Sequence, residues 1–194
     1  RSTSVTMPTL PRSHKILNLS MPAFGGVLGV AGLGLAWREA TPMFAAPEWV
    51  GESLLSGAGL LFAVLCFVYT LKIVRSPQLA LEEIRDNNRI NFFAAIPLCV
   101  MILSAGILPY STSIAALGWL TATITQLILV LIILPKSFRL SLEDYQPSPS
   151  LLLPTAGLLI GPIIGAPIGY INFSWMIFTL GVALWLWVTF LVLR

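Results

Sequence analysis

Charged side chains are scarce in this sequence. Only 10% of its 194 residues are Asp, Glu, Lys or Arg, whereas about 25% are charged in an ordinary soluble domain. Hydrophobic residues make up 57%, and the mean hydropathy is +0.89. This composition excludes a water-soluble globular domain. The 11 Lys and Arg residues are scattered over short polar segments and form no dense basic run, so the net charge of +3 does not indicate a nucleic-acid partner.

Histidine and cysteine are also rare. The single histidine, His14, lies in the polar N-terminal segment, and the two cysteines, Cys66 and Cys99, lie inside apolar runs. Neither cysteine has a histidine or a carboxylate near it in the sequence, which argues against a metal site of the His/Cys type and against a disulfide framework. We therefore expect buried free thiols and no metal or other cofactor.

Ionisable residues are absent from the long apolar runs. Proton-coupled carriers and pumps normally embed such residues in the membrane as relays. No candidate nucleophile has a base near it, and the glycine-rich segment 25–29 lies in an apolar run rather than between a strand and a helix. We expect neither a proton-coupled transporter nor an enzyme.

The apolar runs themselves are long enough to cross a bilayer, which needs about 20 residues for each crossing. Two of them, 90–135 and 145–193, are about twice that length, and turn-forming residues at 109–113 and 169–172 divide each into a hairpin. The sequence predicts an all-α polytopic membrane protein with a tail at 1–18 and a membrane domain at 19–194. Its six transmembrane helices form three hairpins and lie at about 20–37, 53–71, 90–108, 114–134, 151–168 and 173–193. We expect the charged connector after the second span to be partly helical.

The basic residues are distributed unequally between the two sides of this arrangement. Ten of the eleven fall on the side of the N-terminal tail, and only Arg38 falls on the other. Because cytoplasmic loops carry the excess of Lys and Arg, we expect both termini of the chain to be cytoplasmic.

Proline and glycine distinguish the odd spans from the even ones. The first span is rich in glycine, the third contains Pro97, and the fifth contains three prolines and a four-residue glycine repeat, whereas the second and fourth have no internal proline. A proline in a membrane helix frees a backbone carbonyl that protein or water must satisfy. This alternation indicates an inner ring of kinked helices inside an outer ring of smooth ones. For any single glycine, tight helix packing without a pore is the alternative interpretation.

The polar groups inside the spans are small hydroxyl and amide groups, which could replace part of the hydration shell of an anion. For Thr123 and Gln126, on the fourth span, hydrogen bonding between helices is the favoured interpretation. Glu52, at the outer end of the second span, is interpreted as an interfacial residue.

Four segments resemble one known family in order along the chain. They are LSMPAFGGVLG at 19–29, RINFFAAIP at 89–97, GWL with QL at 118–127, and SPSLLLP at 148–154. Together they resemble the tellurite-resistance/dicarboxylate-transporter family, which includes bacterial TehA and the plant slow-type anion channels. This family is also described as the voltage-dependent anion channel and malic acid transport family.

The resemblance implies ten transmembrane helices in five hairpins, with odd helices around a pore, and trimers with one pore in each subunit. It implies localisation in the bacterial inner or cell membrane. The chain would then hold the first six helices and be truncated at its C-terminus, so that the pore-blocking phenylalanine of the family's ninth helix lies outside it. The candidate pore-lining residues are Phe24, Gly25, Gly29, Phe92, Phe93, Pro97, Pro154, Gly157, Gly161 and Pro162.

We therefore expect a membrane channel or transporter that passes small anions or C4-dicarboxylates (chloride, nitrate, malate, sulfite or tellurite class) through a pore lined by kinked odd-numbered helices. Its expected partners are the lipid bilayer, small anions and other copies of the chain. The alternative is a membrane assembly or scaffold subunit without transport, whose glycine faces only pack.

Overall fold

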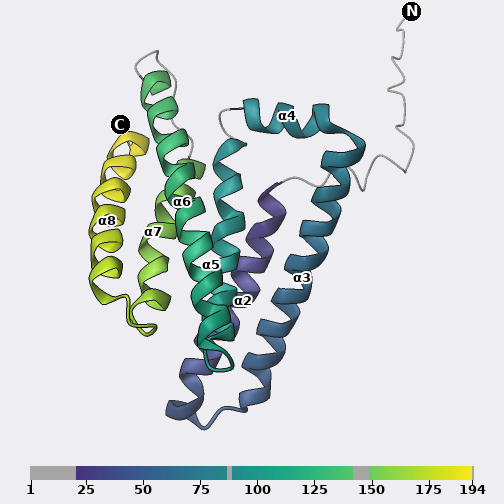
Figure 1. Ribbon diagram of the computed structural model, residues 1–194, viewed down its shortest axis with the longest axis vertical. Coiled ribbons are helices and arrows are strands. Elements are labelled where there is room, and N and C mark those ends of the chain that lie inside the picture. Colours follow the sequence, from purple (N-terminus) through teal and green to yellow (C-terminus); the bar gives the residue numbers. More distant parts are fainter. Residues whose placement is uncertain (1–20, 87–88, 142–148, 194) are drawn as a thin grey trace, which may run out of the picture.

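The protein is a bundle of α-helices. The computed structural model describes residues 21–86, 89–141 and 149–193, and these contain seven α-helices and three short 3-10 helices (Figure 1). The α-helices are α2 (Phe24–Phe44), α3 (Glu48–Arg75), α4 (Pro77–Arg85), α5 (Ala95–Ile107), α6 (Thr112–Ser141), α7 (Leu152–Gly165) and α8 (Ile171–Leu193). The 3-10 helices are η1 (Met21–Ala23), η2 (Ile90–Ala94) and η3 (Pro149–Leu151), and each leads directly or nearly directly into an α-helix.

Four segments are long and apolar enough to cross a membrane: Glu48–Arg75, Ile90–Ile107, Thr112–Lys136 and Ile171–Leu193. They correspond to the second, third, fourth and sixth expected spans. The expectation of an all-α polytopic membrane protein is therefore confirmed. The two other expected spans correspond to α2 and to the segment that ends with α7.

α2 and α7 are not among these four segments, and the charged residues of α2 and the short length of α7 explain why. The charge of Arg38 predicted that the first span ends at about residue 37. Instead, α2 continues through Arg38, Glu39 and Pro42 to Phe44. α7 has 14 residues, which is about 21 Å of helix and shorter than the roughly 30 Å of the hydrocarbon core. It ends at Gly165. Gly169, which the sequence suggested as the last member of the four-residue glycine repeat 157, 161, 165 and 169, therefore lies in the following turn with a φ of +103° and not on the helix.

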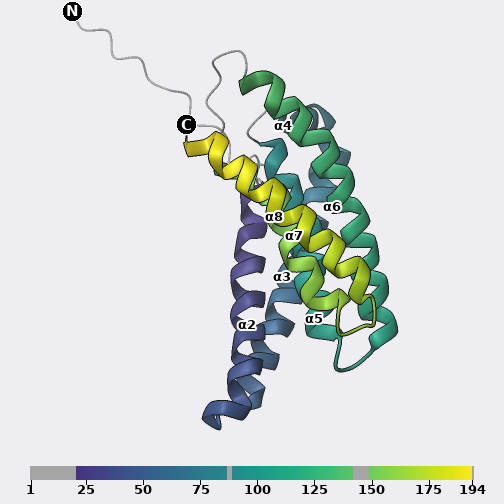
Figure 2. The same cartoon turned by 90° about the vertical axis from the view of Figure 1, so that its left-hand side faces the viewer.

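The helices form two layers. α5 packs against α2 on one side and against α7 on the other, and each of these three has a long partner: α3 beside α2, α6 beside α5, and α8 beside α7 (Figures 1 and 2). Burial distinguishes α5 from the outer helices, because 61% of the Ile90–Ile107 segment is buried, against 22% for α3, 39% for the α6 span and 17% for α8. It does not distinguish α2, in which Phe24, Val27, Ala31 and Gly34 are the buried residues among 21. The odd expected spans thus lie side by side, with the even ones outside.

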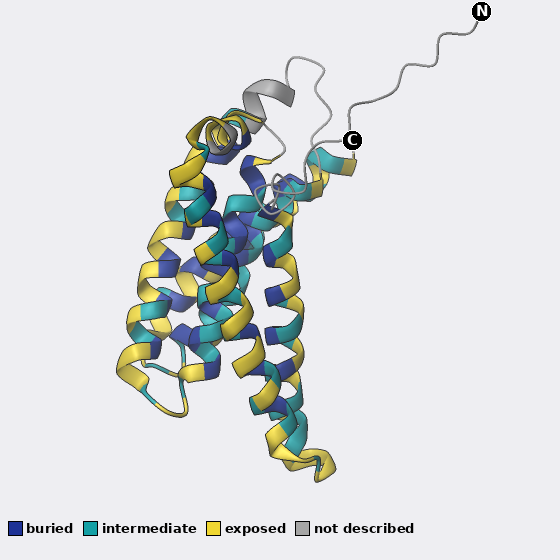
Figure 3. Cartoon of the chain, turned by 90° about the vertical axis from the view of Figure 1, so that its right-hand side faces the viewer, coloured by how far each residue is buried: buried dark blue, intermediate teal, exposed yellow. Residues whose placement is uncertain are grey.

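The long helices α3, α6 and α8 carry large apolar residues that are exposed. Figure 3 shows exposed residues in yellow along the helices. Such faces are unfavourable in water and favourable against lipid acyl chains. Among the described helices, α4 has a different composition, with Glu82, Glu83 and Arg85 among its nine residues. It runs across the end of the bundle at a steep angle to α3 (Figure 1), and it confirms the expected helix in the charged connector.

Candidate functional site

One side of α2 is bare backbone. A Cβ atom added at Gly25, Gly26, Gly29 or Gly32 would meet no other atom within 4 Å. The opposite side carries Phe24, Val27, Ala31 and Gly34, which are buried. The helix therefore packs on one face against α3 and α5 and presents an open glycine face on the other. We call Gly25, Gly26, Gly29 and Gly32 the open glycine face of α2.

The glycines of α7 have different surroundings. A Cβ atom at Gly157 would lie 2.5 Å from Nε2 and 2.7 Å from Cγ of Gln126, and one at Gly165 would lie 2.9 Å from Cε2 of Trp119. At Gly161 the nearest atoms are 3.8 Å away, in Thr123 and Trp119. The glycine repeat of α7 therefore faces α6, and its lack of side chains lets the two helices approach closely.

Two side chains of α6 also bond to the backbone of α7. Trp119 Nε1 donates a hydrogen bond to the carbonyl oxygen of Gly161 at 2.7 Å, and Gln126 Nε2 donates one to the carbonyl oxygen of Pro154 at 2.6 Å. Trp119 and Gln126 are fully buried. The expected role of Gln126 in hydrogen bonding between helices is confirmed, whereas Thr123 Oγ1 has no such partner among the described residues. Trp119 was not among the candidate residues, because its partner Gly161 lies 42 residues further along the sequence.

Two of the three candidate prolines lie at helix starts, where a proline is tolerated. Pro97 and Pro154 are each the third residue of their helix, in α5 and α7, and the backbone N–H groups of a first turn have no partner within the helix anyway. Pro162 lies inside α7. An internal proline also occurs outside the inner layer, since α6 continues past its expected end through Pro135. Internal prolines therefore do not separate the odd helices from the even ones.

The three candidate aromatic residues pack against neighbouring helices. Phe24 is fully buried, with its ring edge-to-face with Phe62 of α3 at 5.9 Å between centroids. Phe93 meets Tyr69 of α3 in the same way at 6.2 Å. Phe92 is half-buried beside the same cluster. These contacts account for the three rings by packing.

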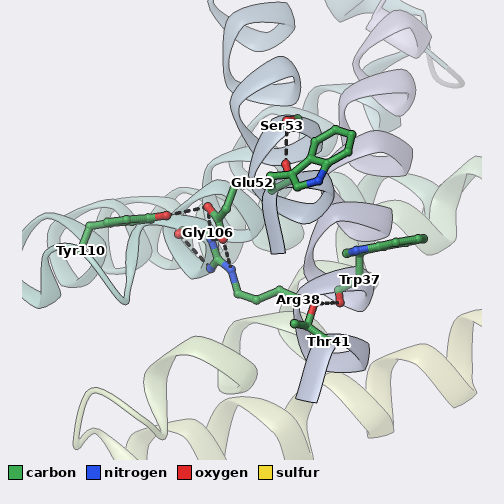
Figure 4. A network of polar contacts seen from close by, with 8 residues as sticks. Trp37, Arg38, Thr41, Glu52, Ser53, Gly106 and Tyr110 are labelled. Atoms are coloured by element: carbon green, nitrogen blue, oxygen red, sulfur yellow. Dashed lines mark hydrogen bonds and ion pairs between the residues drawn. The ribbon is translucent and has the colours of Figure 1, made fainter. Parts of the chain in front are cut away.

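A polar network joins α2, α3 and the end of α5 (Figure 4). Arg38 Nε and Nη2 each donate to a different carboxylate oxygen of Glu52, at 2.8 and 2.9 Å, and Arg38 Nη1 donates to the carbonyl oxygen of Gly106 at 3.0 Å. The Tyr110 hydroxyl donates to Glu52 Oε2 at 2.6 Å, and this bond to a carboxylate raises the pKa of Tyr110. Two cavities of about 270 and 420 Å³ flank the network, and Arg38, Glu52 and Tyr110 line both cavities.

The sequence analysis did not find this network, because Glu52 was interpreted as an isolated interfacial residue. A signal was present. Arg38 and Glu52 are the charges that bound the first two apolar runs on the same side of the membrane, so an antiparallel hairpin brings them together.

We expect Arg38→Gln to lower the free energy of unfolding by about 1–2 kcal/mol, because it removes a bidentate bond and leaves Glu52 partly buried without its cation. Denaturant titration in lipid or detergent would measure this. Arg38→Lys is the control: it keeps the charge but not the planar fork, and should recover only part of the loss. Equal stability of the wild-type protein and Arg38→Gln would mean that the network does not hold the three helices together.

Metal ligands do not cluster in the described part of the chain: no group of three or more His, Cys, Asp or Glu residues could hold an ion there. Cys66 and Cys99 are free thiols, half-buried and buried respectively.

Comparison with known protein families agrees with this architecture. The family model of the voltage-dependent anion channels, SLAC1, matches residues 18–194. No curated protein matches the chain in a sequence comparison. The proteins of the matched family are membrane anion channels and not enzymes. Since the match covers almost the whole sequence, the resemblance found in the sequence is confirmed, and the chain belongs to the voltage-dependent anion channel family.

Proposed function

We propose that the protein conducts small anions or C4-dicarboxylates along the open glycine face of α2. The observation that carries this proposal is that face itself, which lies on the inner layer of the bundle and has no side chain over it at four positions. The open glycine face of α2 leaves room beside the helix backbone for an ion of several ångströms. Its glycines carry no charged side chain that would hold the ion.

In this proposal α5 and α7 support the pathway beside α2. Pro97, Pro154, Gly157, Gly161 and Pro162 shape these two helices, and the close α6–α7 contact at the glycines keeps the inner layer rigid. Gly25 and Gly29 belong to the open glycine face of α2. Phe24, Phe92 and Phe93 stabilise the inner layer by packing, in keeping with their contacts.

We expect selectivity for anions because the described inner helices have no carboxylate next to the open glycine face of α2. Rings of Asp or Glu side chains are the usual device that attracts cations into a channel. The described residues of α5 and α7 include no carboxylate, and the acidic residue of α2, Glu39, lies beyond its glycine face. The reversal potential in reconstituted membranes should therefore follow the gradient of chloride, nitrate or malate and not that of sodium or potassium.

The orientation of the chain is a further part of the proposal. α3 has Lys72 and Arg75 in its last turn and α4 has Arg85 in its last turn. Both helices finish at the end of the bundle from which α2 starts and at which α8 finishes, while α2, with Arg38 in its second half, runs to the opposite end (Figure 1). The excess of basic residues favours the first end as cytoplasmic. We also propose, from family membership, that copies of the protein associate as trimers with a pathway in each.

Gly29→Leu should reduce anion flux by at least tenfold while leaving the amount of folded protein unchanged, because a leucine there projects into open space beside the backbone. Flux into vesicles and size-exclusion profiles would measure the two quantities. Gly57→Leu is a matched control, since Gly57 of α3 also has no atom within 4 Å of an added Cβ but lies on the outer layer. Equal flux through both variants would favour the alternative, a membrane assembly subunit whose glycine faces only pack.

A further inference from the structure

A buried ion pair fixes the position of α4 against α3. Lys72 Nζ lies 2.8 Å from Glu83 Oε1, and the Tyr69 hydroxyl donates to Glu83 Oε2 at 3.1 Å. Only 3% of Lys72 and 4% of Glu83 is exposed, and Tyr69 is also buried. One side of α4 is therefore held against the end of α3, which determines where its other sides point.

A second side of α4 is apolar and uncovered. Leu81 and Ile84 are three residues apart, so they lie on the same side of the helix, and 45% and 44% of their surfaces are exposed. Ile73 and Val74, in the last turns of α3, are exposed as well. Exposed apolar side chains are thus present both at the end of the membrane-spanning helix α3 and on α4, which also carries charged residues.

Positive charge accompanies this apolar surface. Arg75 and Arg85 are exposed, and neither has a salt bridge with another residue in the described part of the chain. Glu83 is neutralised by Lys72, and Asp86 pairs with Arg89 at 3.5 Å. Two arginine side chains are left to meet groups outside the protein.

The level of α4 relative to the membrane follows from α3. The charge-free stretch of that helix, residues 53–71, is about 28 Å long, which matches the roughly 30 Å of a hydrocarbon core. Lys72 and Arg75 therefore lie at headgroup level, and α4 begins two residues after Arg75. It crosses the end of α3 steeply instead of continuing away from the membrane (Figure 1).

We propose that α4 is a membrane-surface helix that docks on phospholipid, with Leu81 and Ile84 directed into the boundary of the acyl chains and Arg75 and Arg85 contacting lipid phosphates. A helix with one apolar side and flanking cations binds at this depth, and long arginine side chains reach the headgroups from it. The buried Lys72–Glu83 pair sets the rotation of the helix. The proposal concerns the lipid surface and does not depend on anion conduction.

Spin labels on the full chain test this. Single cysteines are introduced as Leu81→Cys, Ile84→Cys or Glu82→Cys in a Cys66→Ala, Cys99→Ala background, reconstituted in vesicles of phosphatidylcholine and phosphatidylglycerol. Glu82 is the matched control, because it is exposed and an α-helix turns it about 100° from Leu81 and about 160° from Ile84. Labels at 81 and 84 should show at least a threefold higher ratio of oxygen to nickel-complex accessibility than the label at 82.

Two other results would overturn the proposal. Equal accessibility to the water-soluble nickel complex at all three positions would place the apolar side in the cytoplasm. Protection of 81 and 84 from both reagents would mean that a protein partner or a second copy covers them. The phosphate contact is tested by adding Arg75→Gln and Arg85→Gln to the labelled protein: the label at 84 should move towards water, and an unchanged depth would contradict that contact.

Discussion

Gly157→Leu should lower the free energy of unfolding by about 3 kcal/mol, by overpacking a filled space and breaking a buried hydrogen bond. The added side chain would occupy the position of the Gln126 amide, whose Nε2 lies 2.5 Å from an ideal Cβ at residue 157. Displacing Gln126 also removes its bond to the carbonyl oxygen of Pro154. The measurement is equilibrium unfolding of the reconstituted protein.

Gly29→Leu is the matched control for stability. The substitution is the same and the residue is again a helical glycine, but no atom lies within 4 Å of the added Cβ. Because leucine favours a helix over glycine by roughly 0.8 kcal/mol, this variant should be as stable as the wild-type protein or slightly more so. If Gly157→Leu kept full stability and lost only flux, the glycines of α7 would border the pathway directly and the packing interpretation would be wrong for them.

These two glycines show which parts of the structure can be predicted from the sequence. The number and order of the apolar helices follow from the local sequence, because a segment that crosses the hydrocarbon core must consist mainly of apolar residues. Which way a glycine face points depends on residues far away in the sequence. Gly29 and Gly157 belong to similar glycine-rich patterns, yet one faces open space and the other faces Gln126.

Helix boundaries also depend on residues far away in the sequence. A charge that ends an apolar run does not always end the helix. α2 continues past Arg38 because Glu52, 14 residues later, neutralises it across the hairpin. Likewise, Pro97 and Pro154 could not be recognised as first-turn residues until the ends of η2 and η3 located the starts of α5 and α7.

Glu83→Ala should lower the free energy of unfolding by about 3–5 kcal/mol, the range for removing one partner of a buried ion pair. It would leave the ammonium group of Lys72, 3% exposed, without the carboxylate 2.8 Å away. The cost of breaking a buried pair comes mainly from the charge that remains and not from the lost attraction. Unfolding of the reconstituted protein measures it.

The double variant Lys72→Met, Glu83→Leu separates this cause from loss of packing. It removes both charges and keeps apolar volume between α3 and α4, and such replacements of buried pairs are often neutral or stabilising. We therefore expect it to recover most of the stability that Glu83→Ala loses, although the Tyr69 hydroxyl also loses its acceptor. If the double variant is as unstable as Glu83→Ala, the hydrogen bonds of Glu83, and not the buried charge of Lys72, hold α4 on α3. If Glu83→Ala itself retains wild-type stability, another group satisfies the charge of Lys72, and the Lys72–Glu83 pair does not fix the position of α4.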